Sequence, residues 1–197
     1  MLSTPPAAAV SAPIEEHEIR AALLARLRME WHRDAMVLEE FRIERGSSRI
    51  DVAVIDEELV GYEIKSDKDS FARFSNQIHA YNRVFDRICL VCGPALEESA
   101  RSVIPSWWGV IVAKRDTVGA VSLEIHRDAG VNLRQDAFSL ASLLWREEAL
   151  AALGSLETCT PAPKRVSAHV LWDSMAKNLP VDAIRAVVAE SLLKRQA

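Results

Sequence analysis

Hydrophobic and polar residues follow two different periods along this chain, and the periods divide it into elements. Spacing of three and four residues between apolar positions predicts helices, at 14–29, 71–85, 95–102, 138–153, 166–177 and 181–195. Two-residue alternation or a short continuous apolar run predicts strands, at 35–41, 49–55, 59–65, 88–92, 109–113 and 120–125. Polar turns after the first and second strands make the first three strands a meander.

The order of these elements indicates the fold class. A helix, the meander, a helix, a strand, a helix and two strands are followed by helices alone. This order predicts an α/β or α+β domain with a helical appendage at its C-terminal end. We expect a disordered tail at 1–13, a sheet core at 14–135 and a helical region at 136–197.

Composition and charge narrow the class of protein. The 197 residues carry a formal net charge of −4 and a sequence pI of about 5.8, which argues against a uniformly basic nucleic-acid coat but leaves room for a local basic track. The first thirteen residues lack Lys and Arg, and no run approaches the roughly eighteen apolar residues of a membrane span. Cys89 and Cys92 lie in an apolar run and are expected to be buried strand residues. We therefore expect a soluble, cytoplasmic protein without a membrane partner.

Candidate chemistry lies on the hairpin formed by the second and third strands. Centring the hairpin on Glu57 sets Asp51 opposite Glu63 and Arg49 opposite Lys65. Strand alternation then places Asp51, Glu63 and Lys65 together on one face. The other face is expected to be the core face, with Ile50, Val52, Val54, Val60, Tyr62 and Ile64.

Two opposed carboxylates destabilise a hairpin, and a divalent cation removes that cost. Mg²⁺ commonly binds one or two carboxylates and keeps water and substrate phosphate as further ligands. Lys65 points to the same side as Glu63 and can stabilise charge on a phosphate under attack by water. Gly61 is expected to let a substrate approach closely. The alternative is a solvated hairpin face with an ordinary ion pair, because Asp-x₁₁-Glu-x-Lys is a short and common pattern.

A wider set of residues resembles the PD-(D/E)xK nuclease superfamily, and more narrowly an uncharacterised bacterial and phage family within it. The resemblance rests on Glu40-Phe41, Arg49-Ile50-Asp51, Gly61 to Asp67, and the helix with Gln77 and Tyr81. Ile50 stands where the superfamily often has proline. The resemblance implies a restriction-endonuclease-like αβββαβ core, with a mixed sheet flanked by helices.

The resemblance also implies roles for individual residues. Asp51 and Glu63 would bind the metal, Lys65 would be the catalytic lysine, and Gln77 would hold a metal-bound water or a phosphate. Many members add one more acidic residue, for which Glu40 is our choice. Its rivals are Glu39, Glu18 and Glu15.

Contacts with nucleic acid are expected from residues around this site. Arg73, Gln77 and Tyr81 are four residues apart and share one helical side. We assign nucleic-acid binding to Arg49, Arg73 and Tyr81; solvated arginines and a core position for Tyr81 are the alternatives. Trp107-Trp108 is assigned to core or interface packing rather than to base stacking.

These observations lead to one functional expectation and one rival. The expectation is a Mg²⁺- or Mn²⁺-dependent (deoxyribo)nuclease that hydrolyses phosphodiester bonds with metal-activated water, with DNA as the expected partner. The rival is a catalytically silent protein of the same fold that binds nucleic acid or serves as a scaffold. A homodimer is an open alternative to a monomer.

Overall fold

The computed structural model describes residues 13–31, 34–72, 74–154 and 166–195. Its helices are α1 (Glu16–Glu30), α2 (Phe74–Asn82), α3 (Glu97–Val103), α4 (Ala137–Ala141), α5 (Arg146–Gly154), α6 (Ala168–Asn178) and α7 (Val181–Lys194). Its strands are β1 (Met36–Ile43), β2 (Ser48–Ile55), β3 (Leu59–Lys65), β4 (Arg87–Cys92), β5 (Gly109–Arg115) and β6 (Val121–Arg127). Two 3₁₀ turns, η1 (Glu44–Gly46) and η2 (Pro94–Leu96), complete the elements. The tail predicted to be disordered lies, apart from its last residue, outside the described residues.

One six-stranded sheet organises the fold, with its strands in the order in which they occur along the chain. Strands β3, β4 and β5 run parallel, and the other neighbours are antiparallel. The predicted mixed α+β fold is therefore confirmed. The finer expectation of a restriction-endonuclease-like core is not confirmed.

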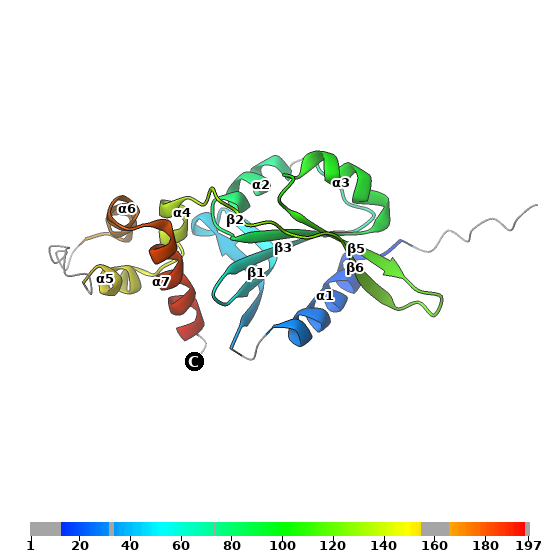
Figure 1. The fold of residues 1–197 in the computed structure, drawn as a ribbon, viewed down its shortest axis with the longest axis horizontal. Helices are drawn as coiled ribbons and strands as arrows, with labels where there is room; N and C mark the ends of the chain where they lie inside the picture. Colours follow the sequence, from blue (N-terminus) through cyan, green and yellow to red (C-terminus); the bar gives the residue numbers. More distant parts are fainter. Residues whose placement is uncertain (1–12, 32–33, 73, 155–165, 196–197) are drawn as a thin grey trace, which may run out of the picture.

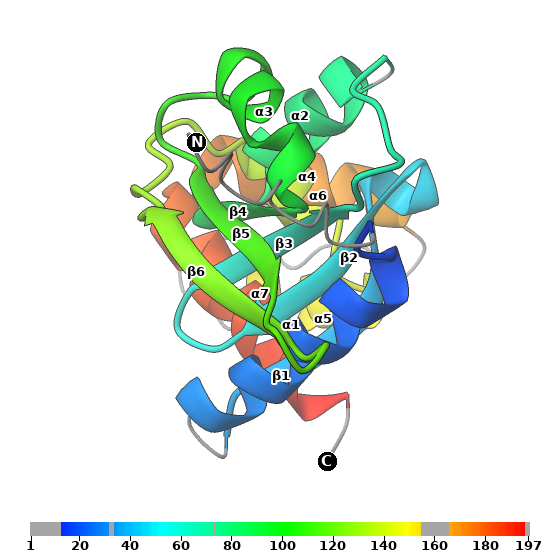
Figure 2. The ribbon, with the colours of Figure 1, turned by 90° about the vertical axis from the view of Figure 1, so that its right-hand side faces the viewer.

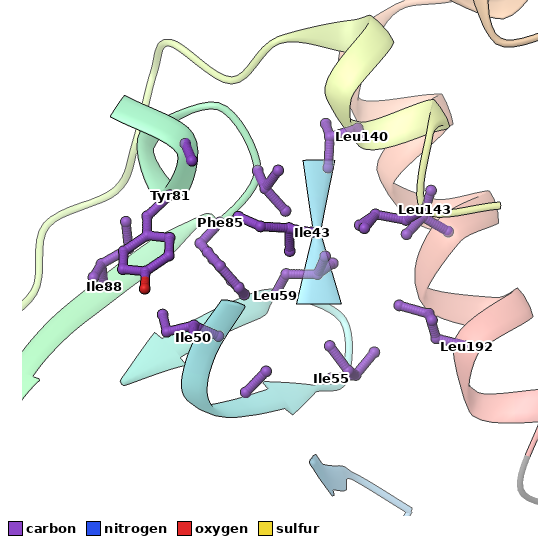
Figure 3. Close-up of a cluster of buried hydrophobic side chains, with 14 of the residues drawn as sticks. Ile43, Ile50, Ile55, Leu59, Tyr81, Phe85, Ile88, Leu140, Leu143 and Leu192 are labelled. Carbon is purple, nitrogen blue, oxygen red and sulfur yellow. The ribbon is translucent and has the colours of Figure 1, made fainter. Parts of the chain in front are cut away.

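Helices cover both faces of the sheet, with α1 on one side and α2 and α3 on the other (Figures 1 and 2). Ile19, Leu23 and Leu27 of α1 bury the face that carries Val52 and Tyr62. The second core cluster extends from α2 to the C-terminal helices, and Figure 3 shows Leu140, Leu143 and Leu192 beside Ile43, Ile55 and Leu59. Helices α4 to α7 thus share a core with the sheet.

Burial on both faces corrects the predicted split of the hairpin. Ile50, which was expected among the residues of the α1 face, packs instead in the cluster of the opposite face with Ala53 and Ile55. A parallel partner strand and helices on each side bury both faces of β3, whose only partly exposed residue is Lys65. The alternative of a solvated hairpin face is therefore wrong.

Gly61 serves this packing rather than an approach to substrate. A Cβ atom at this position would lie 2.5 Å from Ile50 Cδ1 and 3.1 Å from Phe85 Cγ. We expect Gly61→Ala to lower the free energy of unfolding by about 1–3 kcal/mol, because an added carbon overpacks a close-packed core. Urea unfolding would measure this loss, with Gly154→Ala as the control, since a Cβ there meets nothing within 4 Å. A loss no larger than in the control would contradict the packing role.

Two predicted helix boundaries differ from the structure for local reasons. Helix α2 begins at Phe74 rather than at 71, and Asp69, ahead of the helix, accepts hydrogen bonds from Ser66 N and Ser66 Oγ, both at 2.7 Å. The helix predicted at 138–153 is two helices, α4 and α5. Glu148 accepts the backbone N–H of Trp145 at 2.6 Å, which starts α5 afresh after the break.

Two further expectations concern the cysteines and the membrane. Cys89 and Cys92 lie in β4, which confirms the predicted strand; Cys92 is buried, whereas Cys89 is only half-buried. Burial raises the pKa of both thiols to about 12. In the part of the chain that the structure describes, no helix is both long and apolar enough to cross a membrane. The cytoplasmic location stays a prediction.

Candidate functional site

The centre of the candidate site is the carboxylate of Glu63, which is 2% exposed. Lys65 Nζ lies 2.8 Å from Glu63 Oε1, and Gln77 Nε2 donates to the same oxygen at 3.2 Å. The hydroxyl of Tyr81 lies 2.8 Å from Glu63 Oε2. Strand β3 supplies the first two residues from one side of its backbone, and α2 supplies the other two, one helical turn apart. The structure therefore brings together four residues that the sequence predicted for one site.

Asp51 joins the site where the regular ladder of the hairpin ends. The predicted register of Ile55 against Leu59 is confirmed, and pairing continues as far as Val52 with Tyr62. Beyond that pair, Asp51 Oδ2 accepts the backbone N–H of Ile64 at 2.7 Å. The side chain of Asp51 thus replaces a ladder hydrogen bond and is held beside Glu63. The expected pairing of Arg49 with Lys65 does not form, because β3 no longer pairs with β2 there.

The two carboxylates sit in an environment that disfavours their charge. Burial raises the pKa of Asp51, although the Ile64 N–H and the charges of Arg20 and Lys65 act in the opposite direction. Burial also raises the pKa of Glu63, and repulsion from the charge of Asp51 adds to the effect. A cation at this place would relieve both effects.

Arg20 of α1 is a site residue that the sequence analysis missed. Its Nη2 atom lies 3.1 Å from Asp51 Oδ1 and 3.1 Å from Glu40 Oε1, so one guanidinium joins the two carboxylates. Only a distance across the folded molecule reveals this contact, since Arg20 and Asp51 are 31 residues apart. Glu16 pairs with Arg20 one turn away on α1, but Arg26 pairs with Glu30 in the same way, so the sequence of α1 does not single out Arg20.

Glu40 reaches the site through this arginine. Its backbone φ of 56° lies in the left-handed region, which is uncommon for a residue other than glycine. Its Oε2 atom lies 2.6 Å from Arg49 Nε. Among the rivals, Glu39 lies 3.8 Å from Arg20, while Glu18 pairs with Arg115 and Glu15 with Lys68. Glu40 therefore lies nearer to Asp51 than the two helix residues do, but a role for it in the site stays a prediction.

The donor atoms determine which metal the site can hold. Within the described residues, no three His, Cys, Asp or Glu side chains form a metal-holding group, so Glu40 does not complete a carboxylate triad. Asp51 and Glu63 remain as two neighbouring carboxylates whose oxygens have the hard character that a divalent cation such as Mg²⁺ prefers. They fit a small divalent cation such as Mg²⁺, which keeps several waters, and do not fit a cation that needs a full protein cage.

The residues assigned to nucleic-acid contact lie in three different situations. The side chain of Arg49 is 52% exposed, whereas Arg73 lies outside the described residues. Tyr81 is fully buried and stacks on Trp108, and its hydroxyl contacts Glu63 from the side of the core. It therefore positions Glu63 and is not exposed for contact with nucleic acid. Trp108 donates its Nε1–H to Asn82 Oδ1 at 2.8 Å, which confirms its assignment to the core.

Comparison with known proteins gives the chain a family. The model of the family described as bacteriophage P4 protein cII matches residues 10–197. The chain belongs to the P4 cII family. Protein cII of Enterobacteria phage P4 is 26% identical to it over 136 residues, which are 68% of this chain and 51% of the phage protein. This chain thus matches about half the length of the phage P4 protein.

A solved structure also resembles this cII family protein. It is the SPO1766 protein of unknown function from Silicibacter pomeroyi, at 17% identity and a TM-score of 0.44, with 82% of this chain and 83% of the other covered. A TM-score this low does not support any inference about function from the structural similarity.

Membership of the cII family corrects the resemblance drawn from the sequence. The predicted place in the PD-(D/E)xK nuclease superfamily is wrong, because the family that matches nearly the whole chain is that of P4 cII. The predictions that the protein is an endonuclease and restriction-endonuclease-like rested on that resemblance, and they are wrong for the same reason. The geometry around Asp51, Glu63 and Lys65 does not depend on the family name and carries its own chemical argument.

Proposed function

We propose that this cII family protein binds a divalent cation, Mg²⁺ or Mn²⁺, through Asp51 and Glu63 and hydrolyses phosphodiester bonds in nucleic acid, with DNA the expected substrate. The observation that supports this most is the position of Glu63. A carboxylate that is 2% exposed lies beside a second carboxylate and within 2.8 Å of an ammonium group. Buried charges of this kind are costly to a fold and gather at functional sites.

Each residue of the site has a distinct part in the proposed reaction. A bound cation would act as a Lewis acid and lower the pKa of its water. Lys65 Nζ, which is fixed between Glu63 and the Phe74 ring at 5.3 Å from its centroid, would bind the phosphate oxygen on which charge builds. Gln77 and Tyr81 orient Glu63 by hydrogen bonds to its two oxygens.

A second candidate function is a non-catalytic one, in which the protein binds nucleic acid or serves as a scaffold. One observation favours it. Arg20 and Lys65 already neutralise Asp51 and Glu63 within the chain, at 3.1 and 2.8 Å, so the carboxylates have cationic partners of their own. Metal binding would have to compete with these two side chains.

Metal binding can be tested apart from catalysis by thermal unfolding of the full chain. At a concentration about 100 times its Kd, Mg²⁺ or Mn²⁺ is expected to raise the Tm by roughly 5–10 °C through linkage. Asp51→Asn should abolish this rise, because the amide can still accept the Ile64 N–H but lacks the charge that holds a cation. Glu57→Gln, at an exposed residue of the hairpin turn, is the matched control and should keep the rise.

If neither Mg²⁺ nor Mn²⁺ changes the Tm, the proposed metal site is wrong. The same measurement decides against Asp51 as a ligand if Asp51→Asn and Glu57→Gln respond alike. In either case the non-catalytic candidate becomes the better account of the site.

A further inference from the structure

A concave site lies between η1 and the C-terminal helices, and its lining includes none of the carboxylates of the candidate site. Its volume is about 510 Å³, within the range of ordinary ligand pockets. Arg42 and Arg45 form one wall, and Arg146 and Arg195 another, with Glu147 as the one acidic residue in the lining. The apolar part of the lining comes from Phe41, Leu143, Leu144, Trp145, Trp172 and Leu192.

The arginines of the first wall have charge available for a ligand. Arg42 and Arg45 are exposed, and among the described residues neither has an ion-pair partner. In contrast, Arg195 is committed to Glu148, at 2.9 Å from Oε1. A pocket with two uncommitted guanidinium groups attracts an anion, and the planar donor fork of arginine suits phosphate oxygens.

The turn that carries Arg45 is held in place rather than free. Glu44 and Arg45 have φ of 48° and 56°, in the strained left-handed region. Glu44 is fixed by Arg83 at 3.3 Å and by the hydroxyl of Ser139 at 2.9 Å. These contacts, from Arg83 directly after α2 and from Ser139 of α4, hold the strained turn against α4. A preorganised wall loses little entropy when a ligand binds.

Trp145 adds an aromatic surface at the mouth of the pocket. It is 60% exposed although it is large and apolar. The guanidinium of Arg195 lies over its ring at 4.2 Å from the centroid, which fixes the ring and covers one face. Its backbone is fixed by the hydrogen bond to Glu148. A rigid indole with an open face is a platform on which an unpaired base can stack.

We propose that this pocket binds a nucleotide unit of single-stranded nucleic acid, with its phosphate at Arg42 and Arg45 and its base on Trp145. Phosphate recognition accounts for the arginines, and base stacking accounts for the exposed indole. A bare anion would leave the apolar wall unused, and paired bases in a duplex do not present their faces. The proposal does not rest on the metal site, although Arg42 lies two residues from Glu40 on β1.

Fluorescence anisotropy of the full chain with a labelled oligothymidylate of about 12 nucleotides tests this, with EDTA present throughout. Trp145→Ala should weaken binding by about 5- to 150-fold without changing its salt dependence. Arg42→Ala/Arg45→Ala should weaken binding and reduce the slope of log K against log salt by about 0.7, the contribution of the single phosphate that the two arginines bind on a single strand. Arg28→Ala, at an exposed arginine of α1, is the control and should change neither.

Further variants keep the test decisive if Trp145→Ala is unstable. Trp145→Phe retains a ring and should keep most of the affinity, whereas Trp145→Leu retains only apolar bulk and should lose it. An effect of the arginines without any effect of Trp145 would mean an anion site only and overturn the proposal. Equal affinity for duplex and single-stranded DNA would also overturn the proposal, as would binding that no variant of the pocket alters. Because EDTA removes metal ions, the binding measurement does not depend on metal-dependent hydrolysis. Its result therefore stands even if the proposed hydrolysis fails.

Discussion

Replacing Lys65 by methionine is expected to lower the rate of metal-dependent DNA cleavage by about 10²- to 10³-fold, the usual loss when one preorganised group that stabilises transition-state charge is removed. Methionine keeps an apolar stem over Phe74 but has no ammonium group. The measurement compares cleavage of supercoiled plasmid, linear duplex and single-stranded DNA in Mg²⁺ or Mn²⁺, with EDTA as the blank.

Lys68→Met provides the matched control for this prediction. Lys68 lies three residues further along, is 63% exposed at its side chain, and pairs with Glu15 on the surface. It should leave cleavage unchanged. Because Lys65→Met retains Asp51 and Glu63, the metal-induced rise in Tm should persist in this variant, which separates loss of chemistry from loss of metal. Equal cleavage by both variants would remove Lys65 from the mechanism, and no cleavage by the unaltered protein on any substrate would favour the non-catalytic function.

The hairpin could be predicted from the sequence because its information is local. The turn at Asp56 to Glu58 fixes Ile55 against Leu59, and two-residue alternation then determines the side of each residue as far as the pair of Val52 and Tyr62. The convergence of Glu63 and Lys65 followed from their two-residue spacing. Gln77 and Tyr81 followed from their four-residue spacing on a helix that returns over the sheet.

Other features of the site depend on long-range packing and had no local signal. Arg20 contacts Asp51 only because α1 lies across the sheet, and nothing in the pattern of α1 distinguishes this arginine from its neighbours. The left-handed backbone of Glu40 likewise reverses the expectation from simple alternation. The pocket near Trp145 joins β1 to helices about a hundred residues later, a distance in sequence over which periodicity carries no information.

The superfamily resemblance failed for a related reason. Its motifs cover a hairpin and one helix, and such short patterns arise wherever acidic residues and a lysine alternate on a strand. The family match at residues 10–197 draws on the whole chain, including the C-terminal helices that the resemblance matched only weakly. Local pattern therefore supported a proposal about chemistry but did not establish descent.

The second large effect is expected at the ion pair that joins α7 to the sheet. Asp86 is 1% exposed, and its Oδ1 atom lies 2.7 Å from Arg185 Nη1 while its Oδ2 atom accepts the backbone N–H of Leu59 at 2.8 Å. Arg185→Met is expected to lower the free energy of unfolding by about 3–5 kcal/mol, because it leaves a buried carboxylate without its cation. Urea unfolding measures the loss.

Asp182→Ala is the matched control, since Asp182 is the other ion-pair partner of Arg185. The side chain of Asp182 is 83% exposed, so its removal should cost at most about 1 kcal/mol. The double variant Asp86→Asn/Arg185→Met should recover much of the loss, because no charge is then left buried. If Arg185→Met costs no more than the control, the buried pair does not join α7 to the sheet. If it costs the expected amount in a single cooperative transition, the region from 136 onward unfolds with the sheet, as their shared core requires.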